Sequence, residues 1–326
     1  MEHESSATLH RKTGLTELEY RLKTVEHPTH IGEEVLQGKI YIVVPVFNRK
    51  FVTHRFLCCM RKQTFRNFEI IIVDDGSTDG TTELIAEQFK EVQLLRGDGN
   101  LWWTGATNLG IRHAMAQASE DDAILIINDD LDVNSDYLET LHKLLKSMPK
   151  TLIGSVIVDS KNPEIIYDGG RLVNWWTAKF KILNSQRKLS EFAKDYYADV
   201  SLLTGWGTLI PIEVFREIGL YDDKHFQQCG DTELPVRAKN TGYRLVVSYA
   251  ALVKIHIEAS DGINVSSYYS IKDLYKYFFN IKSNFRLKYR FFFGLNTAKN
   301  LLAFISFLLF DLLRISCYFL LRLRFK

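Results

Sequence analysis

Two short runs of apolar, mostly β-branched residues constrain the fold of this chain more than any other feature. Residues 40–44 (IYIVV) and 69–73 (EIIIV) carry almost no polar side chains, and polar, turn-favouring residues follow each run. Apolar runs of this length without alternation are typical of strands that are buried on both faces, as in parallel sheets. The sequence therefore predicts two neighbouring strands of a largely parallel sheet.

Strand-like and helical stretches continue to alternate along the first half of the chain, and the second half is more mixed. Strands that alternate with helices form βαβ units, so the expected fold class is α/β with a mostly parallel central sheet. The expected strands are 40–44, 69–73, 92–95, 123–127, 152–158 and 244–249, and the expected helices are 51–62, 80–90, 104–118 and 211–218.

Polar clusters follow three of the expected strands. They comprise residues 45–49, 74–77 and 128–130, each directly after an apolar run. In parallel α/β sheets, ligands bind beyond the carboxyl ends of the strands, where the strand order switches. The sequence therefore predicts a ligand site built from these three clusters.

Charge is distributed unevenly along the 326 residues. The net charge is only +2, which gives no reason to expect a nucleic-acid partner. Residues 272–326 carry about +9, however, and residues 1–271 carry about −7. An acidic body with a basic, apolar end indicates an enzyme whose C-terminus contacts a membrane.

Cysteine usage and the N-terminus indicate the compartment. The four cysteines, Cys58, Cys59, Cys229 and Cys317, have spacings of neither a zinc site nor a disulfide framework. Reduced thiols suit the cytoplasm. The first residues are polar and lack the apolar core of a signal peptide.

Several ordered motifs resemble family 2 glycosyltransferases, which are inverting enzymes with the GT-A fold. The resemblance covers roughly residues 39–262. Within the family, the sequence is most similar to bacterial rhamnosyltransferases. The motifs that carry it are VVPVFNR (43–49), EIIIVDDGSTDGT (69–81), GNLWWTGATNLGIRHA (99–114), INDDLDV (127–133), TGWGTLIPIEVFREIGLYDD (204–223) and CGDTELPVRAKNTGYRL (229–245).

We expect the chain to divide into three parts. Composition and weak periodicity predict that residues 1–38 are an N-terminal appendage, and the resemblance implies that residues 39–265 are the GT-A catalytic domain. Within that domain, residues 39–133 are the Rossmann-like half that binds the nucleotide sugar. Residues 134–265 are the half that holds the acceptor and the catalytic base. Residues 266–326 form a helical tail that associates with a membrane.

The first two clusters are expected to bind the donor nucleotide. The resemblance implies that Asp74 or Asp75 accepts a hydrogen bond from the imide N–H of a pyrimidine base. Pro45, Phe47 and Arg49 would shape the base pocket or reach the diphosphate. The alternative is that both aspartates only cap a turn and a helix.

The third cluster stands where the family carries its DXD-type metal motif. Mg²⁺ or Mn²⁺ takes hard oxygen ligands from carboxylates and phosphates and neutralises a departing diphosphate. Because Asn128 replaces the first aspartate, Asp130 is the expected metal ligand, with Asp129 nearer the ribose. His256 stands where some members complete the metal shell. A plain turn and a structural histidine remain the alternatives.

Asp231 is the expected catalytic base. Its segment, GDTEL, resembles the family segment whose aspartate deprotonates the acceptor hydroxyl, although Gly230 replaces the usual glutamate. Glu233 is the rival and a further expected sugar contact. A salt bridge of Asp231 with Arg237 or Arg244 is the structural alternative.

Tryptophans and glycines are expected around the donor and acceptor sugars. Tryptophan faces stack on sugar rings, and glycines let the backbone approach closely. Tryptophan is also a common core residue, so a core role remains an alternative. The expected sugar-binding residues, besides Glu233, are Trp102, Trp103, Gly105, Asn108, Gly205 and Trp206.

The expected donor is dTDP-L-rhamnose, with a UDP-hexose or UDP-N-acetylhexosamine as the open alternative. Two other functions compete with glycosyl transfer. A nucleotidyltransferase would carry a glycine-rich, basic phosphate loop near the start, which residues 45–49 do not form. A scaffold that only binds a nucleotide sugar would have no need of Asp130 and Asp231.

The tail turns strongly apolar from residue 289 onwards. Two apolar runs, 301–310 and 315–321, flank Asp311 and Arg314, which would be costly in the bilayer centre. Basic residues on both sides favour helices that lie in the interface on the inner face of the plasma membrane. A membrane-spanning helix and an oligomer-forming helix pair are the alternatives. An acceptor carried on a polyprenyl lipid, as in O-antigen or capsule assembly, would explain the membrane contact.

Overall fold

The computed structural model describes most of the chain beyond its N-terminal segment. The predicted appendage of residues 1–38 lies outside the described residues apart from Gly38, and Cys229 lies outside them as well. Cys58, Cys59 and Cys317 form no disulfide within the described part of the chain. The described ranges are 38–228, 230–256, 270–283 and 285–322.

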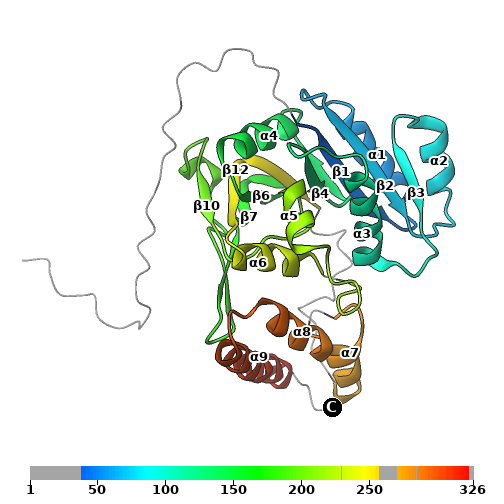
Figure 1. The fold of residues 1–326 in the computed structure, drawn as a ribbon. Coiled ribbons are helices and arrows are strands. Elements are labelled where there is room, and N and C mark those ends of the chain that lie inside the picture. Colours follow the sequence, from blue (N-terminus) through cyan, green and yellow to red (C-terminus); the bar gives the residue numbers. More distant parts are fainter. Residues whose placement is uncertain (1–37, 229, 257–269, 284, 323–326) are drawn as a thin grey trace, which may run out of the picture. The chain divides into compact units, whose positions relative to one another are not determined.

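One half of the central sheet is entirely parallel (Figure 1). Its strands run in the order β3-β2-β1-β4, and β1 pairs in parallel with both β2 and β4. Almost every side chain of β1 is buried, because the sheet continues on both sides and layers cover both faces. The bounds are β1 Ile40–Val46, β2 Phe68–Asp74, β3 Gln93–Arg96 and β4 Ala123–Ile126.

The other half of the sheet mixes parallel and antiparallel pairs. β6 and β12 are parallel to each other, and β11 joins the halves by pairing antiparallel with both β4 and β6. β10 and β5 pair with β12, β7 pairs with β6, and β8 and β9 form a separate hairpin. The bounds are β5 Leu131–Val133, β6 Thr151–Asp159, β7 Asn162–Asp168, β8 Arg171–Asn174, β9 Lys179–Ile182, β10 Tyr197–Asp199, β11 Thr208–Pro211 and β12 Arg244–Ile255.

The expected α/β class and the six expected strands are confirmed, and the four expected helices are found within three residues of their predicted bounds. Strands β5, β7, β8, β9, β10 and β11 are additions, because their short or half-exposed runs lack a clear period. The helices of the body are α1 Lys50–Met60, α2 Thr81–Gln88, α3 Trp102–Met115, α4 Tyr137–Ser147, α5 Ile212–Ile218 and α6 Glu233–Asn240, with a 3₁₀ turn η1 at Leu189–Glu191.

Three helices follow the body: α7 (Leu274–Phe279), α8 (Leu287–Thr297) and α9 (Leu301–Leu321). Figure 1 shows α8 and α9, coloured orange to red, beyond α6, and α8 packs on both α6 and α9. These helices are therefore joined to the body rather than separate from it.

α9 is one continuous helix, although its sequence reads as two apolar runs. Its buried residues are spaced four apart, and Asp311 is the central one of them. Asp311 therefore faces inward, where it meets Arg290 of α8, and it does not interrupt the helix. The buried face consists of Ala303, Phe307, Asp311, Ile315 and Phe319.

By length and composition alone, α9 could cross a membrane. It has 21 residues, and its most apolar window has a mean hydropathy of 1.9 with 22% of that window buried. The other residues of this window are partly or fully exposed, whereas the core helix of a soluble protein is mostly buried.

Helix α3 lies close to the sheet because it carries Gly110 where it crosses β1 and β2. A Cβ at Gly110 would lie 2.5 Å from Cγ1 of Val43 and 3.1 Å from Cγ2 of Val73. Both valines are fully buried strand residues that cannot retreat. We expect Gly110→Ala to lower the free energy of unfolding by about 1–3 kcal/mol, measured by urea denaturation.

Gly105→Ala on the same helix is the matched control. Its Cβ would meet only the Leu101 side chain, at 3.3 Å, and both substitutions gain similar helix propensity. We expect Gly105→Ala to stay within about 1 kcal/mol of the parent protein. Equal effects of the two substitutions would refute the close packing of α3 on the sheet.

Candidate active site

The three polar clusters meet at one edge of the sheet, as predicted. The parallel register pairs Val46 at the end of β1 with Asp74 at the end of β2. The backbone N–H of Asp75 donates to the carbonyl of Val46 over 3.0 Å. The loop after β1 is tied to the loop after β2, because the N–H of Asn48 donates to Oγ of Ser77 at 2.8 Å.

Arg49 joins the first cluster to the third. Its Nε lies 2.9 Å from Oδ1 of Asp129, and its Nη2 lies 2.9 Å from Oδ2 of Asp130. The hydroxyl of Thr53 on α1 donates to the other oxygen of Asp129 at 2.7 Å. Burial raises the pKa of Asp129 to about 6, although Arg49 and Thr53 act in the opposite direction.

Asp74 and Asp75 both accept hydrogen bonds from their own chain. Asp74 accepts from the backbone N–H of Ser77 at 2.8 Å and from the hydroxyl of Thr82. Asp75 accepts from the backbone N–H groups of Gly99 and Trp102, each at 2.9 Å. The capping role weighed from the sequence is therefore present for both side chains, and Asp75 also fixes the loop that leads into α3.

Pro45 and Phe47, at the end of β1, differ in how deeply they are buried. Pro45 is the penultimate residue of the strand and is half-buried. Phe47 follows the strand, and 54% of its surface is exposed. An exposed ring beside a polar strand edge is open to a flat ligand.

A cavity of about 620 Å³ adjoins the end of β4. Its wall combines residues from the β4 end, from the loop before β11, from the β8–β9 hairpin and from α8 and α9. The lining residues are Trp103, Asn128, Arg171, Phe180, Lys181, Ile182, Leu202, Thr204, Gly205, Trp206, Gln228, Asp231, Thr232, Phe285, Tyr289, Arg290, Phe293 and Arg314.

Asp231 lies in the wall of this cavity, within a 3₁₀ turn (η2, Gly230–Thr232) that runs into α6. The backbone N–H of Gly205 donates to Oδ2 of Asp231 at 2.8 Å. Gly205 has to be glycine, because a Cβ would lie 2.8 Å from the Trp103 ring and 3.2 Å from Cβ of Asp231. Burial raises the pKa of Asp231, while the Gly205 N–H and the charge of Arg171 oppose the shift.

Glu233 lies outside the cavity wall, contrary to its expected sugar contact. It is 1% exposed, and its Oε1 accepts from Nε of Arg237 at 2.6 Å and from Asn296 of α8 at 3.0 Å. The salt bridge considered for Asp231 thus belongs to Glu233, and Arg244 pairs with Asp199 instead. The start of α6 turns the two carboxylates in different directions.

Asn128 has a partner that the sequence does not reveal. Its Oδ1 accepts from the indole N–H of Trp103 at 2.9 Å, so an amide here fixes the ring in the cavity wall. Trp103 also meets Tyr221 edge-to-face, with ring centres 5.9 Å apart. Trp206 lines the same cavity, and its expected contact with a sugar stays a prediction.

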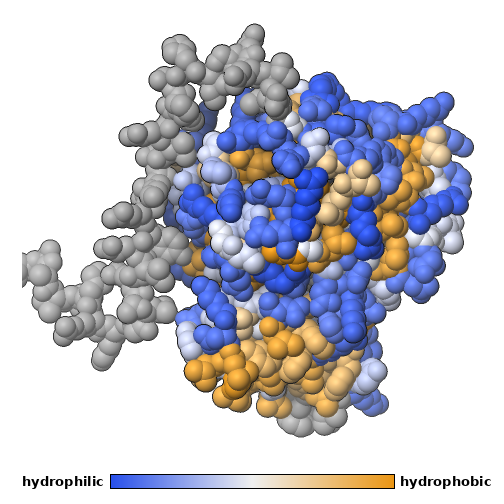
Figure 2. All heavy atoms as spheres, in the orientation of Figure 1, coloured by the Kyte–Doolittle hydropathy of each residue, from blue (hydrophilic) through white to orange (hydrophobic). Residues whose placement is uncertain are grey.

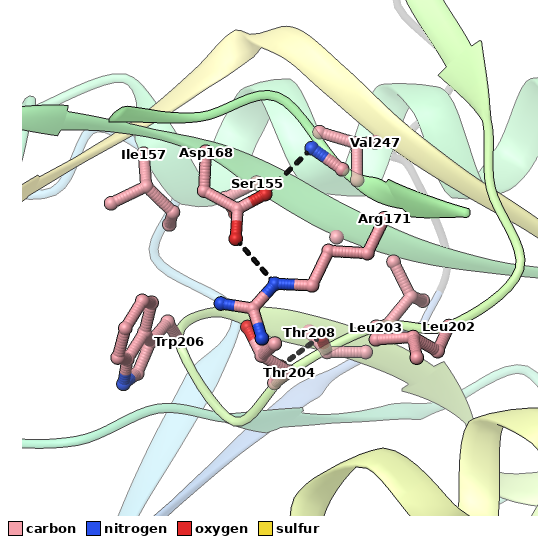
Figure 3. Close-up of a pocket in the computed structure, with 12 residues that line it drawn as sticks. Ser155, Ile157, Asp168, Arg171, Leu202, Leu203, Thr204, Trp206, Thr208 and Val247 are labelled. Carbon is pink, nitrogen blue, oxygen red and sulfur yellow. Dashed lines mark hydrogen bonds and ion pairs between the residues drawn. The ribbon is translucent and has the colours of Figure 1, made fainter. Parts of the chain in front are cut away.

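Arg171 is a cavity residue that sequence reasoning missed. Figure 3 shows its guanidinium held by Asp168 and directed toward Trp206 and Thr204, and the Nε–Oδ2 distance to Asp168 is 2.6 Å. The same aspartate accepts from the backbone N–H of Gly170, whose φ is +111°. The signal in the sequence was a glycine pair between opposite charges, DGGR at 168–171.

Three residues expected at the sugars lie elsewhere. Asn108 is 1% exposed and ties α3 to the loop after α5, because it bonds both backbone groups of Tyr221. Gly105 is buried within α3. Trp102 meets the strand edge through its backbone N–H, and its side chain is not among those that line the cavity.

His256 and Asp130 lie on facing backbone segments. β12 pairs antiparallel with β5, with Ile255 opposite Leu131, so the next position sets His256 opposite Asp130. The imidazole itself bonds Oδ2 of Asp132 at 2.7 Å and Oγ of Ser160 at 3.0 Å. Among the described residues, no group of three or more metal-ligating side chains is gathered.

Comparison with known families gives one clear match. Residues 41–205, which are half of the chain, match the family described as "Glycosyl transferase family 2". The match begins in β1 and ends at Gly205, so it contains the three polar clusters.

Two curated relatives are similar over about two thirds of the chain. The N-acetylglucosaminyl-diphospho-decaprenol L-rhamnosyltransferase of Mycobacterium tuberculosis is 24% identical over 237 residues, 66% of this chain and 75% of that protein. The GalNAc(5)-diNAcBac-PP-undecaprenol beta-1,3-glucosyltransferase of Campylobacter jejuni is 21% identical over 235 residues, 67% of this chain and 74% of that protein.

A solved structure shares the fold. The crystal structure of GalNAc-T7 with UDP, GalNAc and Mn²⁺ superposes with a TM-score of 0.54 and 20% sequence identity. The match covers 67% of this chain and 43% of that chain, so the chain spans less than half of that protein. This likeness establishes the GT-A fold.

The raised pKa of Asp231 predicts that its charge destabilises the folded protein. A folded-state pKa above the ordinary value of 3.8 means that stability falls as the pH rises from there through the folded pKa. At pH 8 we therefore expect Asp231→Asn to be at least as stable as the parent, and the advantage should shrink toward pH 4. Urea midpoints at several pH values measure it.

Glu233→Ala is the control two residues away. It leaves the partly buried Arg237 and the Asn296 amide without their shared carboxylate. We expect a loss of about 3–5 kcal/mol of unfolding free energy. A comparable loss for Asp231→Asn would mean that Asp231 is a structural carboxylate as well.

Proposed function

Because the chain belongs to glycosyl transferase family 2, we propose that it moves a sugar from a nucleoside-diphosphate sugar to a hydroxyl of a glycan or lipid-linked glycan, with inversion of the anomeric centre. The observation that carries the proposal is Asp231. Its half-buried carboxylate lines the cavity beside the end of β4, and neither Arg237 nor Arg244 neutralises it. Family membership favours glycosyl transfer over the nucleotidyltransferase and the non-catalytic scaffold that the sequence also left open.

The strand edge is the proposed donor nucleotide site. Pro45, Phe47 and Arg49 come from the end of β1, and Asp74 and Asp75 come from the end of β2. The exposed Phe47 ring and the half-exposed Arg49 guanidinium are open to a base and a diphosphate. Asp75 is the better of the two aspartates for the base, because it lies beyond the strand and organises the loop to Trp102.

Asp130 and His256 are the proposed ligands of a divalent cation, Mg²⁺ or Mn²⁺, with Asp129 nearer the ribose. A carboxylate oxygen and an imidazole nitrogen on facing segments fit such a cation in their chemistry, and both side chains are about one-third exposed. When bound, the cation neutralises the diphosphate as it leaves. The Asp132 carboxylate holds the imidazole of His256 in place.

The proposed chemistry of Asp231 is general-base catalysis. A carboxylate that burial makes more basic takes the proton of the acceptor hydroxyl as the glycosidic bond forms. The Gly205 N–H holds the carboxylate, and the charge of Arg171 favours its ionised form. Direct displacement from the face opposite the diphosphate inverts the anomeric centre.

The proposed donor is dTDP-L-rhamnose, with a UDP-sugar as the second candidate. The first is supported by similarity to a protein named L-rhamnosyltransferase, and the second by similarity to one named glucosyltransferase. The names of both relatives include a diphosphate-linked prenol as part of the acceptor. We therefore propose a prenyl diphosphate-linked saccharide as the acceptor of this chain.

We propose that α8 and α9 hold the protein on the inner face of the plasma membrane without crossing it. Apolar residues gather over α8 and α9 in Figure 2. The middle of α9 is fixed to α8 by the Asp311–Arg290 ion pair, which a spanning helix would carry into the bilayer. Exposed lysines that suit anionic headgroups occur along the same C-terminal segment: Lys272, Lys276, Lys282, Lys288 and Lys299.

A donor panel tests the reaction and its base together. We expect sugar transfer from one nucleotide sugar in the presence of Mn²⁺ and loss of transfer in EDTA. Asp231→Asn should lower kcat by about 10²–10⁴-fold without unfolding the protein. The control Asp199→Asn changes an exposed carboxylate that pairs with Arg244. Near-normal turnover of Asp231→Asn would exclude Asp231 as the base.

Flotation with phosphatidylglycerol-containing vesicles tests the membrane contact. Leu302, Leu309 and Leu313 are each more than half exposed on α9. We expect replacement of all three by Gln to weaken vesicle binding at least about tenfold, because each leucine contributes about 1–2 kcal/mol when buried. Lys143→Gln and Lys146→Gln on α4 serve as controls.

The alternative to the membrane contact is a contact between copies of the chain. Unchanged flotation of the triple variant, together with a loss of dimers in light scattering, would assign the exposed face of α9 to an oligomer instead.

A further inference from the structure

The cavity that holds Asp231 also gathers cations. Arg171, Lys181, Arg290 and Arg314 line it, and Asp231 is its single lining carboxylate among the described residues. Asp168 pairs with Arg171, and Asp311 pairs with Arg290 and Arg314, so the four cations exceed these three carboxylates by one positive charge. A net positive charge in a concave site attracts an anion. In the function proposed above, the donor diphosphate binds at the strand edge. The cations of this cavity are therefore available to an anionic group of another ligand.

Two of the arginines are held in place by a carboxylate that is itself buried. Asp311 is 0% exposed; its Oδ1 accepts from Nη2 of Arg290 at 2.6 Å and from Nη2 of Arg314 at 2.5 Å. One carboxylate cannot neutralise two guanidinium groups, so a positive charge remains. A buried ion pair contributes little to stability by itself, but it fixes the charges that it holds.

Phe180 of the β8–β9 hairpin completes the arrangement. Cζ of Arg290 lies 5.5 Å from the centre of the Phe180 ring, and Cζ of Arg314 lies 5.6 Å from it. The ring thus orients both guanidinium planes from a third element. Among the described residues, the N–H groups with bonded partners are Nε and Nη2 of Arg290 and Nη2 of Arg314. Each arginine keeps further donors for a ligand.

Aromatic and apolar surfaces surround this pair. Phe285, Tyr289 and Phe293 line the same cavity, and α9 continues from Arg314 into its exposed apolar face. One cavity therefore combines a carboxylate, a group of cations and apolar side chains. These three kinds of group suit a molecule that carries a hydroxyl, phosphate and a hydrocarbon chain.

We propose that Arg290 and Arg314, fixed by Asp311 and Phe180, bind the phosphate groups of a lipid-linked acceptor, between its sugar and its prenyl chain. This inference rests on the proposed function and assigns the phosphate subsite of the acceptor. Planar guanidinium forks suit phosphate oxygens, and two of them suit a diphosphate. The subsite orients the acceptor so that its sugar reaches Asp231 while its chain leaves along α9.

Direct binding of farnesyl diphosphate tests the subsite without any transfer reaction. The titration is done in EDTA and without nucleotide sugar, so that the donor site and its cation do not contribute. We expect farnesyl diphosphate to bind the parent protein at least about tenfold more tightly than farnesol. Arg314→Gln should weaken farnesyl diphosphate binding about tenfold or more, since it removes one guanidinium fork.

The choice of variants keeps the protein folded. Arg314 is 41% exposed, and its loss leaves Asp311 paired with Arg290. Arg187→Gln is the matched control, because Arg187 is also exposed and pairs with a single carboxylate, Glu191, outside the cavity. Equal binding of farnesyl diphosphate to the parent and to Arg314→Gln would overturn the proposal.

A vesicle arm separates the acceptor phosphate from a membrane headgroup. With phosphatidylglycerol vesicles, we expect Arg314→Gln to bind as the parent does, to within about twofold. Weaker vesicle binding with unchanged farnesyl diphosphate binding would assign the arginines to headgroups and overturn the proposal. Binding that depends on Arg314, combined with no transfer from any donor, would refute the proposed enzymatic function and leave the phosphate subsite standing.

Discussion

The site depends on one strand that pairs in parallel with both of its neighbours. β1 is in register with β2 and with β4, so the three strands end at the same edge of the sheet. Residues about 80 positions apart in the chain, such as Arg49 and Asp129, can therefore form an ion pair. A one-residue shift of register would move every side chain of a strand to the opposite face and separate them. The apolar, β-branched strands thus position the polar chemistry.

The two carboxylates at the start of α6 differ in their surroundings, and this difference gives them different roles. Glu233 is sealed with Arg237 and Asn296, and it anchors α8 to the body. Asp231, two residues earlier, faces a cavity and receives one backbone N–H from Gly205. Burial raises the pKa of both side chains, but only Asp231 has a substrate-sized space before it. A basic carboxylate with access is what proton removal from a hydroxyl requires.

The sequence predicts what is local and misses what is long-range. The strands at 40–44 and 69–73 follow from composition and period, and so do the polar clusters after them. Asn108 looks like part of a tryptophan- and glycine-rich sugar motif, but its partners lie 113 residues away at Tyr221. Arg171 was missed for the same reason, because only the fold brings the β8–β9 hairpin to the cavity. The DGGR pattern at 168–171 marks a tight turn, but it does not reveal which cavity the turn faces.

The position of Asp311 in the fold explains a charge that the sequence alone does not explain. In the sequence this aspartate is a costly charge that interrupts an apolar stretch; in the fold it is the fully buried centre of α9. Removing a carboxylate from water costs free energy, and a leucine at position 311 would pack more favourably beside Phe307 and Ile315. The charge is therefore best explained by what it holds: two arginines in the wall of the cavity that contains Asp231. The helix that presents an apolar face outward thus also contributes Arg314 to the cavity that contains Asp231.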